Sequence, residues 1–307
     1  MKRGLLLPMV TSQTEQKIRR SLPVIRFMQA YMPSGLANRI IELSTRNSQE
    51  PDDITRKKIS VNGKSCEWII PQNSPEDQVL LYIHGGAFMF GLTALHIEMI
   101  IHLARIMNTR VLVVNYRLTP EHPFPAALDD CVAAYRWLLQ QGFASEKIVV
   151  AGDSAGGNLT ITTLMKLRDS GDPIPAAAAC LSPVTDLTNK DDPSSLEQDP
   201  LLHPKMVIKA NRYYLADHNA QNPLISPVYG DWRGLPPLLI HAGEDEILLN
   251  DAARGEMMAK KAGVDVRLEI YPRMWHVWQL YLDLPEALLS LDDIAQFLGT
   301  HLKKEAN

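Results

Sequence analysis

The sequence predicts an α/β protein with a mostly parallel central sheet flanked by helices. Two observations carry this prediction. From residue 79 onward, short apolar runs alternate with segments of helical periodicity, and strands separated by helices pair in parallel and are covered on both faces. The chain has 307 residues, 46% of them hydrophobic, so it can bury a sizeable core as one large domain or two smaller ones.

Each element is predicted from its own segment. Residues 54–61 and 66–70 carry strand signals around Asn62-Gly63, a turn typical of a β-hairpin, which adds antiparallel strands at one edge of the sheet. The other strands are expected at 79–84, 110–115, 147–151, 176–181, 237–242 and 264–271. Helices are expected at 94–107, 126–140, 155–169, 204–216, 250–262 and 286–303.

Residues 1–47 carry no strand signal. Apolar residues keep helical spacing there in two groups separated by Pro33, which predicts two helices ahead of the first strand. The groups are Ile18, Leu22 and Ile25, then Leu36, Ile40 and Leu43. Such helices either form a lid or cap over the rest of the chain or pack on its flank, and both arrangements stay open at this point.

Charge and composition exclude several function classes. A net charge of −4 and a pI near 6.1 leave no basic footprint for nucleic acid. Cys66, Cys131 and Cys180 form no C-x-x-C pair and are interpreted as reduced, buried thiols of a cytoplasmic protein. The apolar start of the chain is broken by Pro8, too early for a signal peptide, and no run is long enough to span a membrane.

The segment 152–157, Gly-Asp-Ser-Ala-Gly-Gly, predicts a reactive serine. It follows an apolar run at 148–151 and precedes a helical segment, so Ser154 would stand at a sharp strand–turn–helix junction. Gly152 and Gly156 are the small residues that such a turn requires two positions either side. The hydroxyl would be exposed at the carboxyl end of the sheet, near the positive end of a helix dipole.

A glycine pair ends the strand predicted at 79–84. Adjacent glycines can turn backbone N–H groups toward an anion, so the N–H groups of Gly85, Gly86 and Ala155 are the predicted oxyanion hole. The alternative is a plain glycine turn. His84, which precedes the pair, is interpreted as bracing the loop rather than as a base.

A serine nucleophile also needs a base and an acid that orients the base. His276 lies between the last predicted strand and the final helix, where it can reach Ser154. The acid is expected after the strand at 237–242, where the loop offers Glu244, Asp245 and Glu246. Spacing alone does not choose among these three carboxylates.

Three motifs together resemble the bacterial hormone-sensitive-lipase family of esterases, a branch of the α/β-hydrolase fold. They are His84-Gly85-Gly86-Ala87-Phe88, the run 116–130 and the segment 152–157, and the resemblance extends from about residue 77 to the C-terminus. The resemblance implies an ester hydrolase with an N-terminal helical cap over its acyl pocket. It also implies Ser154 as nucleophile, His276 as base and the oxyanion hole named above.

Two positions depart from the family pattern. Many members carry a third glycine where this chain has Ala87, a change that leaves the first two glycines in place. Many also carry an aspartate two residues before a leucine as the acid. Aligning on Leu248 places Glu246 at the acid position, and Asp245 is the alternative after a one-residue slip.

The implied reaction is that of a serine carboxylesterase, which hydrolyses small-molecule esters with short- to medium-length acyl chains through an acyl-enzyme. Neither a metal nor an organic cofactor is expected. Phe88, Phe90, Trp275 and Trp278 flank the predicted site and are candidate pocket residues, although each is also an ordinary core candidate. An amidase or formamide hydrolase on the same residues is an alternative. A non-catalytic small-molecule receptor of this fold would lack the base, which His276 supplies here.

The predicted domains are a helical cap at 1–47, with contributions from about 185–225, and a catalytic domain at 48–307. The sequence suggests no apolar surface element of the kind that a lipid-interface lipase carries. The strand at 264–271 is a candidate for the sheet edge, and an edge strand can pair with its own copy, so a homodimer through this strand is a further expectation.

Overall fold

The computed structural model describes residues 12–46, 50–188 and 199–302. Two predictions fall partly on other residues. The apolar start of the chain, compared above with a signal peptide, lies outside the described residues. Residues 189–198, within the region expected to contribute to the cap, also lie outside them.

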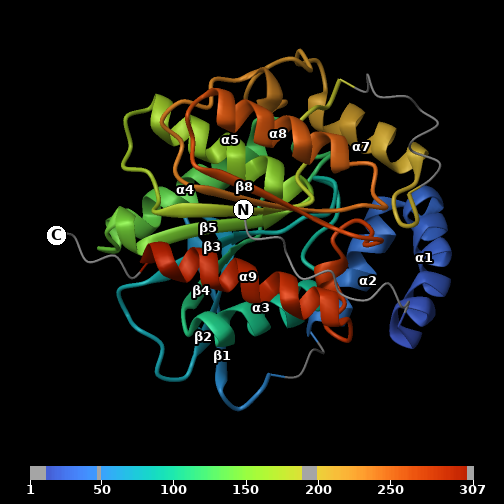
Figure 1. Cartoon of the computed structure of the whole chain (residues 1–307), viewed down its shortest axis with the longest axis horizontal. Helices are drawn as coiled ribbons and strands as arrows, with labels where there is room; N and C mark the ends of the chain where they lie inside the picture. Colours follow the sequence, from blue (N-terminus) through green and yellow to red (C-terminus); the bar gives the residue numbers. More distant parts are fainter. Residues whose placement is uncertain (1–11, 47–49, 189–198, 303–307) are drawn as a thin grey trace.

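An eight-stranded sheet forms the centre of the molecule (Figure 1). Its strands lie in the order β1-β2-β4-β3-β5-β6-β7-β8, and every pair from β4 to β8 is parallel. The strands are β1 (Ile54–Val61), β2 (Lys64–Pro71), β3 (Val79–Ile83), β4 (Arg110–Val114), β5 (Ile148–Asp153), β6 (Ala177–Leu181), β7 (Leu238–Gly243) and β8 (Val266–Tyr271). The α/β prediction with a mostly parallel sheet is confirmed.

The antiparallel edge of the sheet is the predicted hairpin. β1 pairs with β2, and β2 continues antiparallel onto β4. Val61 lies opposite Lys64 across the turn, and both turn residues have positive φ, 49° at Asn62 and 79° at Gly63. Asn-Gly is favoured in such a two-residue turn because Asn tolerates and Gly freely adopts this conformation.

Helices cover both faces because the inner strands are apolar on both sides, as β3, β5, β6 and β7 are buried at every residue. One face is covered by α4 (Ala126–Gln140), α5 (Ala155–Asp169) and α8 (Leu249–Lys261), and the other by α3 (Ala94–Met107) and α9 (Pro285–Leu302) (Figure 1). The predicted bounds of these five helices hold within one residue.

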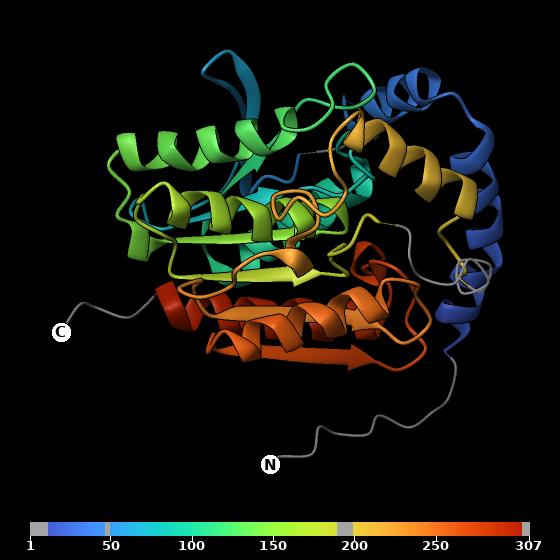
Figure 2. The ribbon, with the colours of Figure 1, turned by 90° about the horizontal axis from the view of Figure 1, so that it is seen from above.

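Three more helices lie at the carboxyl end of the sheet: α1 (Gln13–Tyr31), α2 (Ser34–Arg46) and α7 (Pro204–Leu215). Figure 2 shows the strand arrows pointing toward α1 and α7. α1 packs against α7, and α2 packs against α3. The two helices expected before the first strand are therefore present, next to the end of the sheet where parallel α/β folds place their sites.

Two surface features complete the description. β8 ends the sheet opposite the hairpin, as expected, and among the described strands only β7 pairs with it. Within the described ranges, no helix combines the length and apolar character needed to cross a membrane.

The three cysteines are free and buried. Burial raises the pKa of the Cys66 thiol to about 11 and that of Cys180 to about 12. All three thiols lie in the core on the α4, α5 and α8 side of the sheet, where they act as small apolar side chains.

Candidate active site

Ser154 stands where β5 turns sharply into α5. Its backbone has φ 54° and ψ −119°, a conformation that costs a non-glycine residue about 1–3 kcal/mol. The turn is tight enough that a Cβ on Gly152 would overlap the backbone of Gly156, and a Cβ on Gly156 would overlap the carbonyl oxygens of Ile83 and His84. The sequence predicted small residues at both positions, and these overlaps are the physical reason.

His276 brings Ser154 and Glu246 into one line of contacts. His276 Nε2 lies 2.8 Å from Ser154 Oγ, and its Nδ1 lies 2.8 Å from Glu246 Oε2. The second carboxylate oxygen, Oε1, accepts a hydrogen bond from the Gly243 N–H at 3.0 Å. An ionised carboxylate only accepts, so Nδ1 carries a proton and Nε2 is left to accept the serine proton.

The electrostatics of His276 follow from its burial and its acidic partner. Burial lowers the pKa of His276, but the hydrogen bond and the charge of Glu246 raise it by more, so the net pKa lies above the ordinary value of 6.5. His276 and Glu246 are 4% and 7% exposed. Water therefore competes little with their contact, and the imidazolium form gains stability from a partner already in place.

Asp245, the alternative acid, lies elsewhere. Its Oδ2 accepts a hydrogen bond from Arg19 Nη2 of α1 at 2.7 Å, at the surface of the molecule. The structure brings Glu246 to His276 and Asp245 to Arg19 of α1. The third carboxylate of this loop, Glu244, accepts a hydrogen bond from the Arg273 N–H at 3.0 Å.

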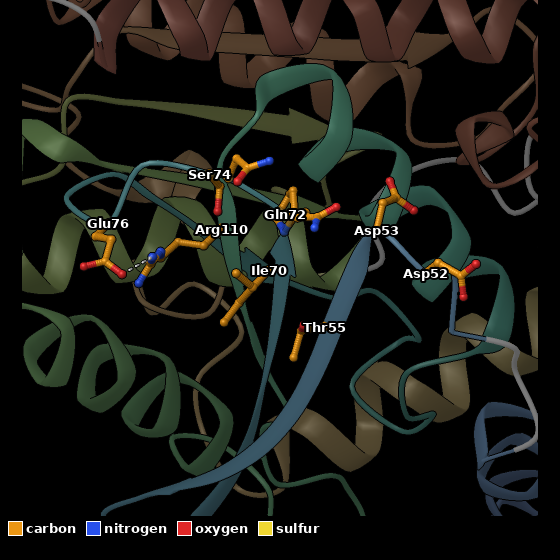
Figure 3. A pocket seen from close by; sticks show the side chains of 10 residues that line it. Asp52, Asp53, Thr55, Ile70, Gln72, Ser74, Glu76 and Arg110 are labelled. Carbon is orange, nitrogen blue, oxygen red and sulfur yellow. Dashed lines mark ion pairs between the residues drawn. The ribbon is translucent and has the colours of Figure 1, made fainter.

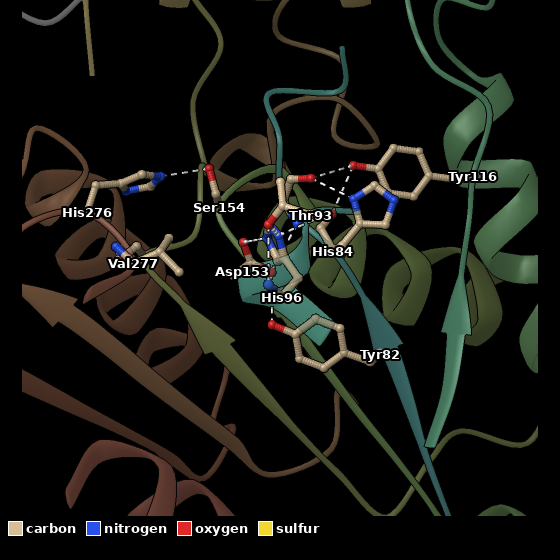
Figure 4. A network of polar contacts seen from close by, with 11 residues as sticks. Tyr82, His84, Thr93, His96, Tyr116, Asp153, Ser154, His276 and Val277 are labelled. Atoms are coloured by element: carbon tan, nitrogen blue, oxygen red, sulfur yellow. Dashed lines mark hydrogen bonds and ion pairs between the residues drawn. The ribbon is translucent and has the colours of Figure 1, made fainter. Parts of the chain in front are cut away.

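The loop after β3 corrects one part of the oxyanion prediction. The Gly85 N–H donates to Asp153 Oδ1 at 3.0 Å, so this N–H is already occupied (Figure 4). Gly86 and Ala87 lie next along the chain and are half-buried, and no acceptor is recorded for either N–H among the described residues. Ala155 opens α5, where the first N–H groups of a helix lack helical partners.

The sequence did not predict Ala87 as an oxyanion donor, although the family's frequent third glycine at this position was a signal for it. Its φ is 54°, in the left-handed region that favours glycine. The family's frequent third glycine at this position fits that conformation, which costs a residue with a Cβ about 1–2 kcal/mol. The same left-handed conformation can turn the Ala87 N–H toward the site.

Asp153 is a second residue whose role the sequence did not reveal. It is buried next to Ser154 and accepts hydrogen bonds from the Tyr82 hydroxyl at 2.8 Å and the Gly85 N–H, with His96 Nε2 at 3.2 Å (Figure 4). Burial alone would raise the pKa of this carboxyl, but His96 and Tyr82 lower it by more, so it lies below its ordinary value. The charged Asp153 thus anchors the loop after β3, which carries Gly85 and Gly86 and is called the glycine loop below, to the turn between β5 and α5 that carries Ser154.

His84 braces the same loop. Its ring stacks on Tyr116 with centroids 4.4 Å apart, and the Tyr116 hydroxyl donates to the His84 carbonyl oxygen at 2.9 Å. Burial, with a smaller contribution from His96, lowers the pKa of His84 to about 4. A neutral ring stacked on Tyr116 agrees with a bracing role.

Three of the four candidate pocket residues are packed inside the protein. Phe88 stacks on Tyr214 with ring centroids 3.7 Å apart, and Trp275 and Trp278 are 0% exposed in a cluster with Leu22 of α1. These side chains have no free surface for a substrate, so the structure corrects their placement to core positions. Phe90 alone is half-buried.

A different apolar cluster lies beside the loops that carry Gly86 and Glu246. It joins the glycine loop, the acid loop and α7, and its partly buried members include Ala87, Phe90 and Ile247. The buried members are Met89, Leu202, Met206, Ala210 and Leu248. Ile247 follows Glu246 and Ala87 follows Gly86, so this cluster borders both halves of the site.

Contacts from α1 and α2 reach the loops of the site. Asn38 of α2 donates from Nδ2 to the Met89 carbonyl oxygen at 2.9 Å and accepts from the Gly91 N–H at 3.0 Å. Arg19 of α1 contacts Asp245, as described above, and also donates to the Arg273 carbonyl oxygen. Through these contacts α2 is joined to the loop after β3, and α1 is joined to the loops that carry Asp245 and Arg273.

One cavity of about 370 Å³ lies at the opposite end of the sheet (Figure 3). Its lining includes Asp53 at the start of the hairpin, Ile70 at its end and Arg110 at the start of β4, with Glu76 3.7 Å from Arg110. Because Ser154 follows the carboxyl end of β5, this cavity is separate from the serine site.

Comparison with known proteins identifies the family of the chain. Residues 80–280 match the family model of the alpha/beta hydrolase fold. The chain is 40% identical to an acetyl-hydrolase of Streptomyces hygroscopicus over 245 residues, 79% of this chain and 82% of the relative. It is 36% identical to an esterase of Acinetobacter venetianus over 224 residues, 72% of this chain and 74% of the relative.

Solved structures give the same result over nearly the whole length. An esterase of the bacterial hormone-sensitive lipase family superposes with a TM-score of 0.87 at 40% identity, covering 96% of this chain and 100% of that one. A mutant of the esterase E40 superposes with a TM-score of 0.89 at 38% identity, covering 95% and 99%. The chain therefore belongs to the alpha/beta hydrolase fold family, in its bacterial hormone-sensitive-lipase branch of esterases.

Proposed function

We propose that the chain is a serine carboxylesterase in which Ser154, His276 and Glu246 act as nucleophile, base and orienting acid. The observation that carries this proposal is the pair of 2.8 Å contacts from Ser154 through His276 to Glu246. Relatives with the names acetyl-hydrolase and esterase support ester hydrolysis as the reaction. No described contact gives Asp245 a comparable place.

Acylation begins at the serine hydroxyl. His276 Nε2 takes the Ser154 proton while Oγ bonds to the ester carbonyl carbon, and the carbonyl electron pair moves onto its oxygen. Glu246 holds the resulting imidazolium in place. His276 then gives its proton to the departing alkoxide, which leaves as the alcohol, and the acyl group stays on Ser154.

Deacylation repeats these steps with water. His276 Nε2 takes a proton from the water as its oxygen attacks the acyl carbon, and returns that proton to Ser154 Oγ as the carboxylic acid leaves. Both tetrahedral intermediates carry a negative oxygen. We infer that the N–H groups of Gly86, Ala87 and Ala155 hold it, because the Gly85 N–H is occupied by Asp153.

We further propose that α1, α2 and α7 cap the site, and we refer to them below as the cap helices. α7 contributes Met206 to the apolar cluster beside the glycine loop, which supports an acyl site between that loop and α7. A short or medium acyl chain is the substrate range that the resemblance to this esterase family implies. The cytoplasmic location and the homodimer through β8 remain predictions.

The proposal is tested by hydrolysis of p-nitrophenyl esters from acetate to palmitate. We expect activity to peak at short or medium chains, and Ser154→Ala to lower kcat about 10⁶-fold, to the background level. Ser170→Ala, an exposed serine at the end of α5, is the matched control and should leave kcat unchanged.

Two results would contradict the proposal. A folded Ser154→Ala variant that keeps its activity would exclude this serine as nucleophile. A folded wild type without activity on any of these esters would exclude the esterase assignment, and the same comparison on p-nitroanilides would then examine the amidase alternative.

A further inference from the structure

The outer side of α1 exposes a face of mixed apolar and cationic residues. Val24, Phe27, Met28 and Tyr31 follow one another at helical spacing, and each is between 44% and 62% exposed. Arg20 and Lys17 are exposed one and two turns before Val24, at the same spacing. Positions 17, 20, 24, 27, 28 and 31 fall within about a third of the helix circumference, so all six side chains share one face.

The other two cap helices have the same arrangement. On α2, Leu36, Ile40 and Leu43 are 48% to 59% exposed, and the exposed Arg39 lies within their stripe. The sequence predicted a helix from these three residues, since their spacing resembles that of a buried face. The structure leaves them on the surface, contrary to the expectation that the chain carries no apolar surface element.

On α7, the exposed Lys205, Ile208 and Arg212 also keep helical spacing. This face adjoins that of α1, because Lys205 Nζ donates to the Tyr31 hydroxyl at 3.2 Å and lies 4.9 Å from the centre of the Tyr31 ring. Figures 1 and 2 place α1 and α7 side by side at the end of the molecule. We call these exposed side chains the cap face: Lys17, Arg20, Val24, Phe27, Met28, Tyr31, Leu36, Arg39, Ile40, Leu43, Lys205, Ile208 and Arg212.

Charge is distributed very unevenly between the cap and the rest of the chain. Residues 13–45 and 204–215 hold eight Lys or Arg and two Glu, a net charge of +6. The whole chain carries −4, so the remainder carries −10. The cap face itself includes five cations and no carboxylate.

We propose that the cap face binds an anionic lipid surface. Helices with exposed Phe, Leu, Ile and Met beside Lys and Arg lie in the plane of a membrane interface, with the apolar side chains among the acyl chains and the cations at the phosphates. A symmetric contact between two cap faces is disfavoured, because it would bring the five cations of one face against the same five of its copy. The proposal concerns binding alone and stands or falls separately from the proposed reaction.

The test is cosedimentation of the full chain with lipid vesicles, without substrate. Vesicles of phosphatidylcholine alone are compared with vesicles that also contain phosphatidylglycerol, at low salt and at about 1 M salt, where charges are screened beyond about 3 Å. We expect binding to the anionic vesicles at low salt, and a large loss in high salt or on neutral lipid. Each cation at the surface contributes about fivefold to the binding constant.

Matched variants separate the cap face from charge and hydrophobicity elsewhere. Lys17→Glu with Arg20→Glu should lower binding at least about 25-fold. Lys57→Glu with Lys58→Glu on β1 changes the net charge equally, at exposed positions outside the cap, and should bind as the wild type does. Met28→Gln should lower binding severalfold, and Met257→Gln, at an exposed position on α8, should not.

Three results would overturn the proposal. One is no sedimentation of the wild type with anionic vesicles. A second is equal loss of binding in the cap and β1 charge variants. The third is a dimer in light scattering that Met28→Gln dissociates, which would assign the cap face to a second copy of the chain. Circular dichroism and urea denaturation serve as the folding controls for every variant, because neither depends on the proposed reaction.

Discussion

Replacing Glu246 by Gln tests the orienting acid most sharply, because the two carboxylate oxygens have different partners. Oε2 accepts from His276 Nδ1 at 2.8 Å, and Oε1 accepts from the Gly243 N–H at 3.0 Å. Gln has nearly the same shape but only one oxygen, so one of these donors must face an NH₂ group. If the oxygen stays on Gly243, Nδ1 must accept, the proton moves to Nε2, and His276 can no longer act as base.

The expected loss in kcat is about 10⁴-fold, the size of the loss seen when a serine enzyme loses its orienting carboxylate. At about 1.4 kcal/mol for each factor of ten, this corresponds to about 5.5 kcal/mol of transition-state stabilisation. The misplaced buried donor should also lower the free energy of unfolding by about 1–3 kcal/mol. Steady-state hydrolysis of p-nitrophenyl butyrate measures the first effect, and urea denaturation measures the second.

Asp245→Asn is the matched control, since it removes one charge from the adjacent residue. Asp245 is paired with Arg19 at the surface, and such a pair contributes about 0–1 kcal/mol to stability. Its kcat should stay near that of the wild type. The reasoning is refuted if Asp245→Asn abolishes activity while Glu246→Gln retains it, because the acid would then be one residue earlier.

Three further predictions concern protonation, the glycine loop and assembly. Because the base must be neutral and the pKa of His276 is raised, kcat/KM should fall as pH drops, with its inflection above pH 6.5 in the wild type. The inflection should lie lower in a variant without the Glu246 charge. An inflection below pH 6.5 in the wild type would contradict the assignment. Gly85→Ala should lower kcat by about 10²-fold or more, since the added Cβ would overlap the Asp153 carboxylate. Gly91→Ala should be nearly neutral, because its Cβ would lie 3.9 Å from a side-chain carbon of Leu118. Equal activities of the two variants would refute the anchoring role of Asp153. If two β8 strands pair, light scattering should give twice the 34.4 kDa chain mass. Ile270→Lys, at an exposed position of that edge strand, should restore the monomer. A monomeric wild type would contradict this prediction.

Local sequence was sufficient for the elements and for the chemistry of single residues. The alternation of apolar runs with helical segments predicted the sheet and the five helices on its faces, because buried parallel strands must be apolar throughout and their crossover helices must be amphipathic. The glycines around Ser154 predicted the sharp turn, since close backbone approach leaves no room for a Cβ. His276 was predicted from its place after the last strand.

Local spacing could not choose among neighbours in the chain, and the preference for Glu246 came from the family alignment on Leu248. Asp245 and Glu246 are adjacent and chemically similar, and the path of the loop after β7 decides which carboxylate meets His276 and which meets Arg19. Gly85 and Ala87 lie two residues apart, and the buried Asp153, which occupies the Gly85 N–H, comes from another strand.

Burial was the property that local pattern predicted least well. Trp275 and Trp278 beside the base were expected near substrate, but α1 and the loop after β8 enclose them. Leu36, Ile40 and Leu43 have the spacing of a buried face and are exposed, because no described element packs over that side of α2. Spacing along a helix depends on neighbouring residues, whereas exposure depends on what distant segments cover, and only the tertiary structure decides that.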